Sequence, residues 1–264
     1  MILKNKSDSD EILTSTSDHI LKITLNKPQK KNALSNVMYD RLTELLKHSE
    51  EDSEIHIIVL TGSGDYFTAG NDIAAFQSGV DLAYNKKSSF YFMNALATFK
   101  KPIIAAVNGN AIGIGVTLLL HCDLIYATDS SDFTMPFLSL GLVPEFASTR
   151  LLTEILGHSR AAELLMIGEK FDSVTAERLG IINKVVTEDE LMSYVYRNAR
   201  TLASKPTKAV QTTKRLMKKR PHQQVLDIID EEAREFSQCL RTPETQSIVA
   251  TFLNKKKLAK KGSK

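Results

Sequence analysis

Glu145 is the residue of this chain whose sequence neighbours best suit acid–base chemistry. It lies in the segment MPFLSLGLVPEFASTR, residues 135–150, directly after Pro144 and before Phe146. A carboxyl group among apolar neighbours is costly to ionise, so its pKa rises toward neutrality. Such a pKa suits a general base or acid that works near pH 7. The same segment also fits an exposed loop glutamate, and by itself it leaves both interpretations open.

Two glycine-containing loops offer hydrogen-bond donors for such chemistry. In the first, DYFTAGNDI (residues 65–73), Gly70 permits a backbone conformation closed to other residues and would direct the N–H of Asn71 outward. The second, NGNAIGIG (residues 108–115), precedes an apolar helical run. N–H groups at a helix N-terminus favour negative charge, and two that converge on one oxygen form an oxyanion hole. Each loop alone fits an ordinary strand-to-helix turn equally well.

Other reaction classes fail on spacing. Neither loop contains GxGxxG or the GK[ST] of a phosphate-binding loop. The segment GHSRA, residues 157–161, resembles a nucleophile elbow but ends in alanine and follows no predicted strand. The six histidines show no HxH or HExxH spacing, so no metal site is expected. Asp123 fits a buried hydrogen-bonded residue or a cap better than a catalytic acid.

Hydrophobic periodicity predicts the elements that must position these residues. Short apolar or β-branched runs predict strands over residues 20–25, 55–61, 103–107, 124–127 and 181–186. Helical spacing predicts helices over residues 34–50, 149–156, 160–167, 175–179, 191–203, 206–219, 223–239 and 242–253. Strands and helices that alternate in this way predict an α/β chain with mostly parallel sheets. We expect a core at residues 1–200 and a helical C-terminal region with a basic tail at 201–264.

Composition agrees with a globular protein of ordinary core size. The chain has 264 residues, of which 42% are hydrophobic and 25% charged. The net charge of +3 is too small to indicate a nucleic-acid partner. Residues 254–264 hold six lysines and no acid, which fits a solvated terminus or contact with an anionic ligand. Cys122 and Cys239 lack CxxC spacing, which fits a reducing compartment.

Targeting signals are not evident in the sequence. The longest apolar stretch, residues 111–120, is too short to span a bilayer, and the first residues show no apolar leader segment. The end Gly262-Ser263-Lys264 is not an SKL-type peroxisomal signal. We therefore expect a bacterial cytoplasmic protein without a membrane partner, with the peroxisome or mitochondrion as alternatives for a eukaryotic source.

Four segments, in order along the chain, carry a family resemblance. They are LNKPQKKNALS (25–35), IIVLTGSGDYFTAGNDI (57–73), KKPIIAAVNGNAIGIGVTLLLHCDLIYA (100–127) and FTMPFLSLGLVPEFASTRLL (133–152). Together they resemble the enoyl-CoA hydratase/isomerase, or crotonase, superfamily from about residue 18 to 253. The resemblance implies a crotonase-like ββα spiral core with a C-terminal helical trimerisation region. It also implies an acyl-CoA substrate, no cofactor besides the coenzyme A of that substrate, and a homotrimer or a dimer of trimers.

The resemblance also implies a set of site residues. Glu145 would be the catalytic base, and the backbone N–H groups of Asn71 and Ile114 would hold the thioester oxygen. The further substrate-binding residues would be Lys30, Lys31, Ala69, Gly70, Asp72, Ile73, Gly113, Phe137, Lys255 and Lys256. The lysines would contact the ADP moiety, with ordinary surface positions as the alternative. The acyl chain would lie under a mobile wall at residues 77–90, in a pocket lined by Phe76, Phe90, Phe92, Met93, Leu96 and Phe137.

The subgroup follows from residues that differ from the hydratase pattern. Hydratases of this family use two glutamates, and their places hold Thr117 and Phe137 here. The segments FTAGND, GIGVTLLL and PEFAST are similar to the peroxisomal-type Δ3,Δ2-enoyl-CoA isomerases, whose single base is the Glu of this PEF turn. We expect Glu145 to move a C3 double bond to C2 by shuttling one proton through an oxyanion-stabilised dienolate. The alternatives are another crotonase-type enzyme (hydratase, thioester hydrolase or lyase) or a non-catalytic acyl-CoA-binding protein.

Overall fold

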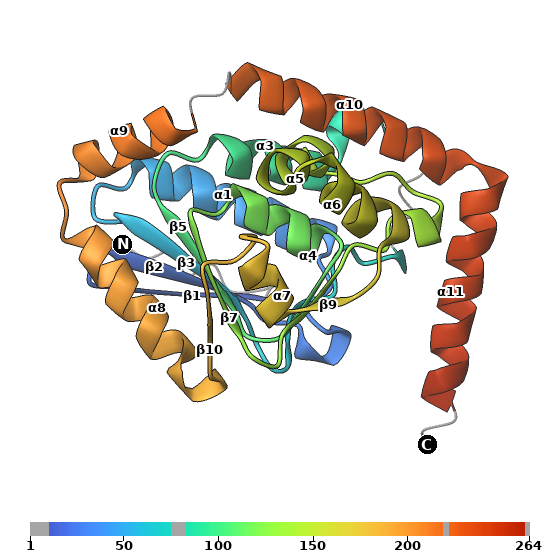
Figure 1. Cartoon of the computed structure of the whole chain (residues 1–264), viewed down its shortest axis with the longest axis horizontal. Coiled ribbons are helices and arrows are strands. Elements are labelled where there is room, and N and C mark those ends of the chain that lie inside the picture. Colours follow the sequence, from blue (N-terminus) through green and yellow to red (C-terminus); the bar gives the residue numbers. More distant parts are fainter. Residues whose placement is uncertain (1–10, 75–82, 219–221, 262–264) are drawn as a thin grey trace.

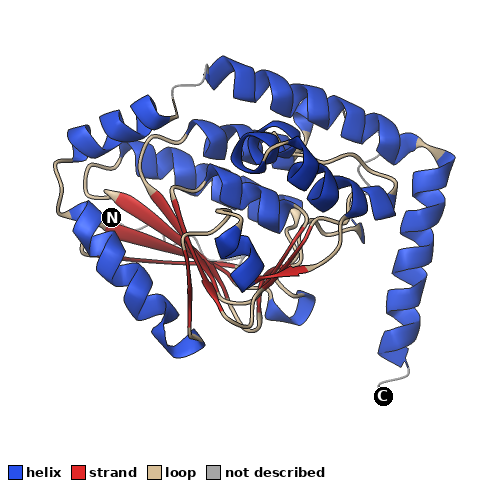
Figure 2. Cartoon of the chain, viewed as in Figure 1, coloured by secondary structure: helices blue, strands red, loops and turns tan. Residues whose placement is uncertain are grey.

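Two β-sheets form the centre of the molecule, and helices surround them (Figures 1 and 2). The computed structural model describes residues 11–74, 83–218 and 222–261, without the side chains of residues 222, 223 and 255–261. The larger sheet has the strand order β1-β2-β3-β5-β7-β10, and the smaller has the order β4-β6-β8-β9. Within them, only the pairs β1–β2 and β8–β9 are antiparallel. The α/β prediction with mostly parallel strands is confirmed.

The strands agree with the sequence prediction where they are long and apolar. They are β1 (Ile12–Ser17), β2 (Ile20–Leu25), β3 (Ile57–Gly62), β4 (Tyr66–Thr68), β5 (Ile103–Val107), β6 (Asn110–Ile112), β7 (Leu124–Thr128), β8 (Asp132–Thr134), β9 (Phe171–Asp172) and β10 (Lys184–Val186). β10 is shorter than predicted because the N–H groups of Ile181 and Ile182 bond back to Ala176. The short strands β4 and β6 lie within the two glycine-containing loops and were not predicted.

The helices match most predicted ranges. They are α1 (Asn36–Glu51), α3 (Ser88–Thr98), α4 (Ile114–Thr117), α5 (Ser148–Leu156), α6 (His158–Ala162), α7 (Ser173–Arg178), α8 (Glu188–Ala203), α9 (Thr207–Met217), α10 (His222–Arg241) and α11 (Pro243–Lys261). The helix predicted over 160–167 is present, but it changes from α-helical in α6 to π-helical over Glu163–Ile167. α3 was not predicted. No helix in the described part of the chain is both long and apolar enough to cross a membrane.

The central strands β3 and β5 of the six-stranded sheet are buried on both faces. Along β3, Ile57 and Val59 face the packing surface of α8, whereas Ile58 and Leu60 face the main core. This follows from the alternation of side chains along a strand. α8 contributes Val195 and other apolar residues to the first layer. Residue 200 lies inside α8, and the division at this position remains a prediction.

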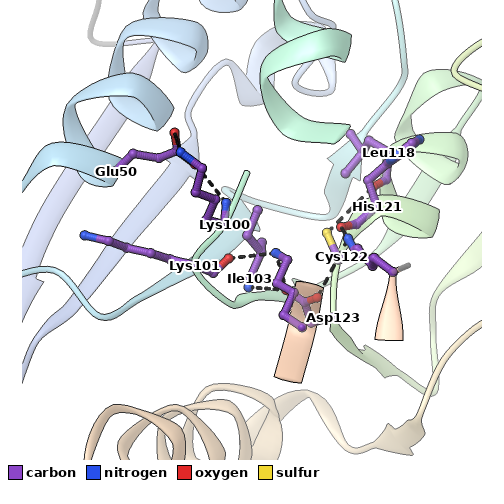
Figure 3. A network of polar contacts seen from close by, with 10 residues as sticks. Glu50, Lys100, Lys101, Ile103, Leu118, His121, Cys122 and Asp123 are labelled. Carbon is purple, nitrogen blue, oxygen red and sulfur yellow. Dashed lines mark hydrogen bonds and ion pairs between the residues drawn. The ribbon is translucent and has the colours of Figure 1, made fainter. Parts of the chain in front are cut away.

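Polar contacts around Asp123 join the starts of β5 and β7 (Figure 3), and Lys214 of α9 takes part in them. The carboxylate of Asp123 accepts a hydrogen bond from the backbone N–H of Ile103 at 2.8 Å and one from Lys214 Nζ at 2.7 Å. Lys214 also donates to the carbonyl oxygen of Lys101 at 2.7 Å. Burial lowers the pKa of Lys214 to about 8. The prediction that Asp123 is a hydrogen-bonded structural residue is confirmed.

The last two helices enclose one end of the molecule. α10 crosses α3, and α11 follows it along the outer edge (Figure 1). The hydroxyl of Thr245 on α11 donates to the carbonyl oxygen of Gly141 at 2.8 Å. The C-terminal helical region therefore reaches the turn structure that precedes Glu145.

Candidate active site

Glu145 lies in a turn with an uncommon backbone. Phe146 and Ala147, which follow it, have φ angles of 69° and 56°. Few residues other than glycine adopt this left-handed region. The ring of His121 stacks on Phe146 at a centroid distance of 3.9 Å, and its Nε2 lies 2.8 Å from the carbonyl oxygen of Phe146. Burial lowers the pKa of His121 to about 3, so the ring is neutral and donates from Nε2 to this carbonyl.

The carboxyl group of Glu145 is buried and hydrogen-bonded to the side chain of Asn71. Only 5% of the residue is exposed, and its Oε1 accepts a hydrogen bond from Asn71 Nδ2 at 2.9 Å. On its other side, Asn71 Oδ1 accepts a hydrogen bond from the hydroxyl of Tyr39 at 2.5 Å. The interpretation of Glu145 as an exposed loop residue is therefore excluded.

The surroundings of Glu145 raise its pKa to about 8. Burial is the largest cause, because it penalises the charged form. The hydrogen bond from Asn71 acts in the opposite direction, the negative charge of Glu232 raises the pKa further, and the positive charge of Lys87 lowers it. A carboxyl group with this pKa exchanges a proton readily at neutral to mildly alkaline pH.

Glu145 lines a cavity of about 100 Å³. The cavity lies between α1, the loop after Gly70, the start of α3 and α10, and is lined by Leu34, Asn36, Tyr39, Asn71, Asp72, Tyr84, Lys87, Ser88, Ser89, Phe90, Met93, Glu145, Ala233, Phe236, Ser237 and Leu240. Sequence reasoning identified Asn71, Asp72, Phe90, Met93 and Glu145 among them. The predicted wall at 77–90 also contributes Tyr84, Lys87, Ser88 and Ser89. Tyr39 and the whole wall from α10 were not predicted, although the apolar spacing of residues 229, 233, 236 and 240 marks the buried face of that helix.

The two glycine-containing loops come together beside Glu145. A Cβ on Gly70, which has a φ of 81°, would lie 2.6 Å from the carbonyl oxygen of Ile112 and 3.8 Å from the N atom of Ile114. Ile114 begins α4, so its N–H has no acceptor within that helix. A bridge to Leu34 uses the carbonyl of Gly70 and the N–H of Asp72, which leaves the N–H of Asn71 directed away from Leu34.

Both hydratase-type positions lack a carboxyl group and are turned into the interior. Thr117 is fully buried, and its hydroxyl donates to the carbonyl oxygen of Ile114 at 3.5 Å. Phe137 is 4% exposed, and its ring lies 4.0 Å from the position of a Cβ on Gly113. Phe137 does not line the cavity, contrary to the pocket prediction, and neither do Phe92 and Leu96. The side chains of all three pack against other buried apolar side chains of the main core.

The remaining predicted positions lie around the cavity or outside the described residues. Lys30 Nζ lies 3.6 Å from Asp72, and Lys31 Nζ donates to the hydroxyl of Tyr66 at 2.9 Å. The N–H of Ala69 donates to the carbonyl oxygen of Lys31, and Ile73 is half-buried. Phe76, residues 77–82 of the predicted wall and the side chains of Lys255 and Lys256 lie outside the described residues. The roles of these residues in binding stay predictions.

The chain matches a known protein family over most of its length. The family model described as "Enoyl-CoA hydratase/isomerase" matches residues 15–262. The chain belongs to the enoyl-CoA hydratase/isomerase family. The similar solved structure of Pseudomonas aeruginosa OdaA has a TM-score of 0.89 and 38% sequence identity, covering 92% of this chain and 99% of that one. The predicted family and its crotonase-like fold are confirmed.

Members of the enoyl-CoA hydratase/isomerase family with different names are about equally similar to this chain. "Enoyl-CoA delta isomerase 2" of Rattus norvegicus is 34% identical over 94% of this chain, which spans 65% of that protein's length. "Probable enoyl-CoA hydratase" of Rhizobium meliloti (strain 1021) is 32% identical over 94% of this chain and 96% of its own length. Overall likeness therefore does not separate the two reactions, and the choice between them depends on the residues of the site.

Proposed function

We propose that this protein is a Δ3,Δ2-enoyl-CoA isomerase in which Glu145 is the catalytic base. The observation that carries the proposal is the buried carboxyl group of Glu145, which lines the cavity and accepts a hydrogen bond from Asn71 Nδ2 at 2.9 Å. A pKa of about 8 allows the group to accept a proton in one step and to return it in the next.

The proposed reaction moves one proton and leaves the composition of the substrate unchanged. The Glu145 carboxylate removes a proton from C2 of a 3-enoyl thioester, and the electron pair of that C–H bond forms a dienolate. The protonated carboxyl group then delivers the proton to C4, which leaves the double bond between C2 and C3. The burial of Glu145 supports this shuttle because a dry site limits proton exchange with solvent.

The dienolate carries its charge on the thioester oxygen, which requires hydrogen-bond donors. We propose that the N–H groups of Asn71 and Ile114 form this oxyanion hole, as their adjacent loops suggest. One donor of this type contributes about 3–4 kcal/mol to the stability of such a transition state. Gly70 and Gly113 would let the backbone take the required shape, with φ angles of 81° and 57°.

Hydration needs a second group to activate and place a water molecule, and the site supports this reaction less well. Thr117 and Phe137 supply no carboxylate. Asp72 also lines the cavity, but its carboxylate lies 3.6 Å from Lys30 Nζ and accepts the N–H of Ala74 at 3.2 Å. An Asp engaged in this way is a poor candidate for the second hydratase group.

The proposed reaction transfers no electrons or hydride, so we propose no cofactor besides the coenzyme A of the substrate. Lys30 and Lys31 lie on the exposed side of the loops and are proposed to contact its ADP moiety, together with Lys255 and Lys256. The proposed assembly is a homotrimer or a dimer of trimers, which is the assembly that the family resemblance implies.

Side-by-side assays of 3-enoyl-CoA and 2-enoyl-CoA thioesters test the proposal. We expect the wild-type protein to isomerise the first without hydrating the second. Glu145→Ala should reduce isomerisation by about 10²–10⁴-fold, the usual contribution of a general base. Glu163→Gln, an exposed charge change on the surface, is the matched control. Full activity of folded Glu145→Ala, preferential hydration, or binding without turnover would each overturn the proposal.

A further inference from the structure

Glu232 of α10 is a second buried carboxyl group, and it lies directly behind the turn that carries Glu145. It is 7% exposed. Its Oε2 accepts the N–H of Ala147 at 2.6 Å. Its Oε1 accepts the N–H and the hydroxyl of Thr149 at 3.0 and 2.6 Å. The carboxylate of one helix therefore receives three hydrogen bonds from the segment that follows Glu145.

This turn needs an external support. Left-handed backbone at Phe146 and Ala147 is unfavourable for residues other than glycine and persists only where the surroundings hold it. α5 starts at Ser148, and no side chain of its own N-cap residue, Ala147, accepts the first N–H groups. Such groups need acceptors from elsewhere. Glu232 supplies one for Thr149 and, through its other oxygen, fixes Ala147.

We propose that Glu232 is a positioning residue for Glu145, which holds the left-handed turn in place and presents a negative charge behind the base. This inference rests on the proposed function of Glu145. The same helix supplies Ala233, Phe236 and Ser237 to the cavity wall, so α10 supports the base from behind and encloses it from the side.

The charged groups around Glu145 determine the sign of the electrostatic effect. From α10, the charge of Glu232 raises the pKa of Glu145. From the segment before α3, the charge of Lys87 lowers it. Tyr39 of α1 has a pKa well above its usual value, so it is neutral, and the imidazole of His121 behind Phe146 is neutral as well. Removal of the Glu232 charge should therefore lower the pKa of Glu145.

The hydrogen bonds around Glu232 favour its charged form. Its two oxygens accept three hydrogen bonds from Ala147 and Thr149. Burial raises the pKa of Glu232 to about 7, and these hydrogen bonds oppose the rise.

The test compares Glu232→Gln with Glu235→Gln, which removes the same charge from an exposed position one turn along α10. For each protein, kcat/KM for a 3-enoyl-CoA is measured from pH 5 to 10, and folding is followed by thermal unfolding. Glu232→Gln should move the acid limb of kcat/KM to lower pH and reduce kcat by up to about 10²-fold, as expected for a misplaced base. Glu235→Gln should match the wild type.

Thr149→Val tests the hydrogen-bonding part of the role. It removes the hydroxyl donor to Glu232 and leaves the carboxyl group of Glu232 in place, so it should reduce kcat because the turn is less firmly held. If the acid limb of the kcat/KM profile is the same in Glu232→Gln as in the wild type, the inference is overturned, whether or not kcat falls.

Carbon-13 NMR titration of the glutamate carboxyl groups, with Glu145 assigned from Glu145→Gln, provides a readout besides activity. A lower pKa of Glu145 in Glu232→Gln supports the inference, and an unchanged pKa overturns it. If the wild type isomerises no enoyl-CoA, the proposed function fails, and the titration alone decides the role of Glu232.

Discussion

Asn71 and Glu145 are joined by a side-chain hydrogen bond, from Nδ2 to Oε1 at 2.9 Å, although 74 positions separate them in the chain. The same asparagine contributes a backbone N–H directed away from Leu34. In the proposed mechanism, Asn71 would orient the base through its side chain and bind the substrate oxygen through its backbone N–H. A side-chain substitution changes only the first of these two functions.

Asn71→Ala should raise the pKa of Glu145, because the hydrogen bond from Asn71 lowers it. The acid limb of kcat/KM would move to higher pH, which is opposite to the shift expected for Glu232→Gln. A lost hydrogen bond to a charged group costs about 1.5–3 kcal/mol, or roughly 10–100-fold in rate near neutral pH. A pH profile with 3-enoyl-CoA checks this, and an unchanged limb would contradict it.

Lys87→Met should also move the acid limb to higher pH. Lys87 lines the cavity, donates to the hydroxyl of Ser237 at 3.2 Å, and lowers the pKa of Glu145 through its positive charge. Met keeps most of the side-chain volume and removes the charge. Lys86→Met, at the exposed neighbouring position, is the control and should leave the profile unchanged. A shift to lower pH in Lys87→Met would refute the electrostatic assignment.

Glu145→Gln should stabilise the protein at alkaline pH while it removes activity. The pKa of Glu145 is about 8 in the folded protein and about 4.3 in an unfolded chain. Between these values the folded state binds more protons, so the contribution of this group to stability is present at low pH and is lost as the pH rises through 8. We expect a gain of a few kcal/mol at pH 9 and little change at pH 4.5.

Urea unfolding of Glu145→Gln and the wild type at both pH values measures this difference. Glu163→Gln, at an exposed position, should show none of it. Equal free energies of unfolding for Glu145→Gln and the wild type at pH 9 would show that burial of the charged base is not destabilising.

Lys214→Met should destabilise the attachment of α9. It removes the ion pair with Asp123 at 2.7 Å and leaves a partly buried carboxylate, at a cost of about 3 kcal/mol. Because the pKa of Lys214 falls to about 8 on folding, the wild type should also gain stability between pH 8 and 10, and the variant should not. Urea unfolding checks both effects, with exposed Lys208→Met as control. A cost equal to that of the control would contradict the prediction.

The sequence predicts the strands and helices whose own residues form an apolar run or a helical period. β3 and β5 are apolar runs that are buried on both faces, β2 and β7 are largely apolar, and α1 and α8 have clear helical periods. β4, β6, β8 and β9 have two or three residues each and exist because they pair with one another across long sequence separations. Their own residues carry too little periodic signal to mark them.

The sequence by itself determined the family, the two glycine-containing loops and the single glutamate in an apolar turn, because residue type and short spacing carry these features. Only the tertiary structure decided what surrounds that glutamate. Asn71, from a loop, bonds to Glu145, which lies 74 positions along the chain. Glu232, from α10, bonds to Ala147, which lies 85 positions away. Burial and charge, which raise the pKa of Glu145 to about 8, arise only when these distant segments pack together.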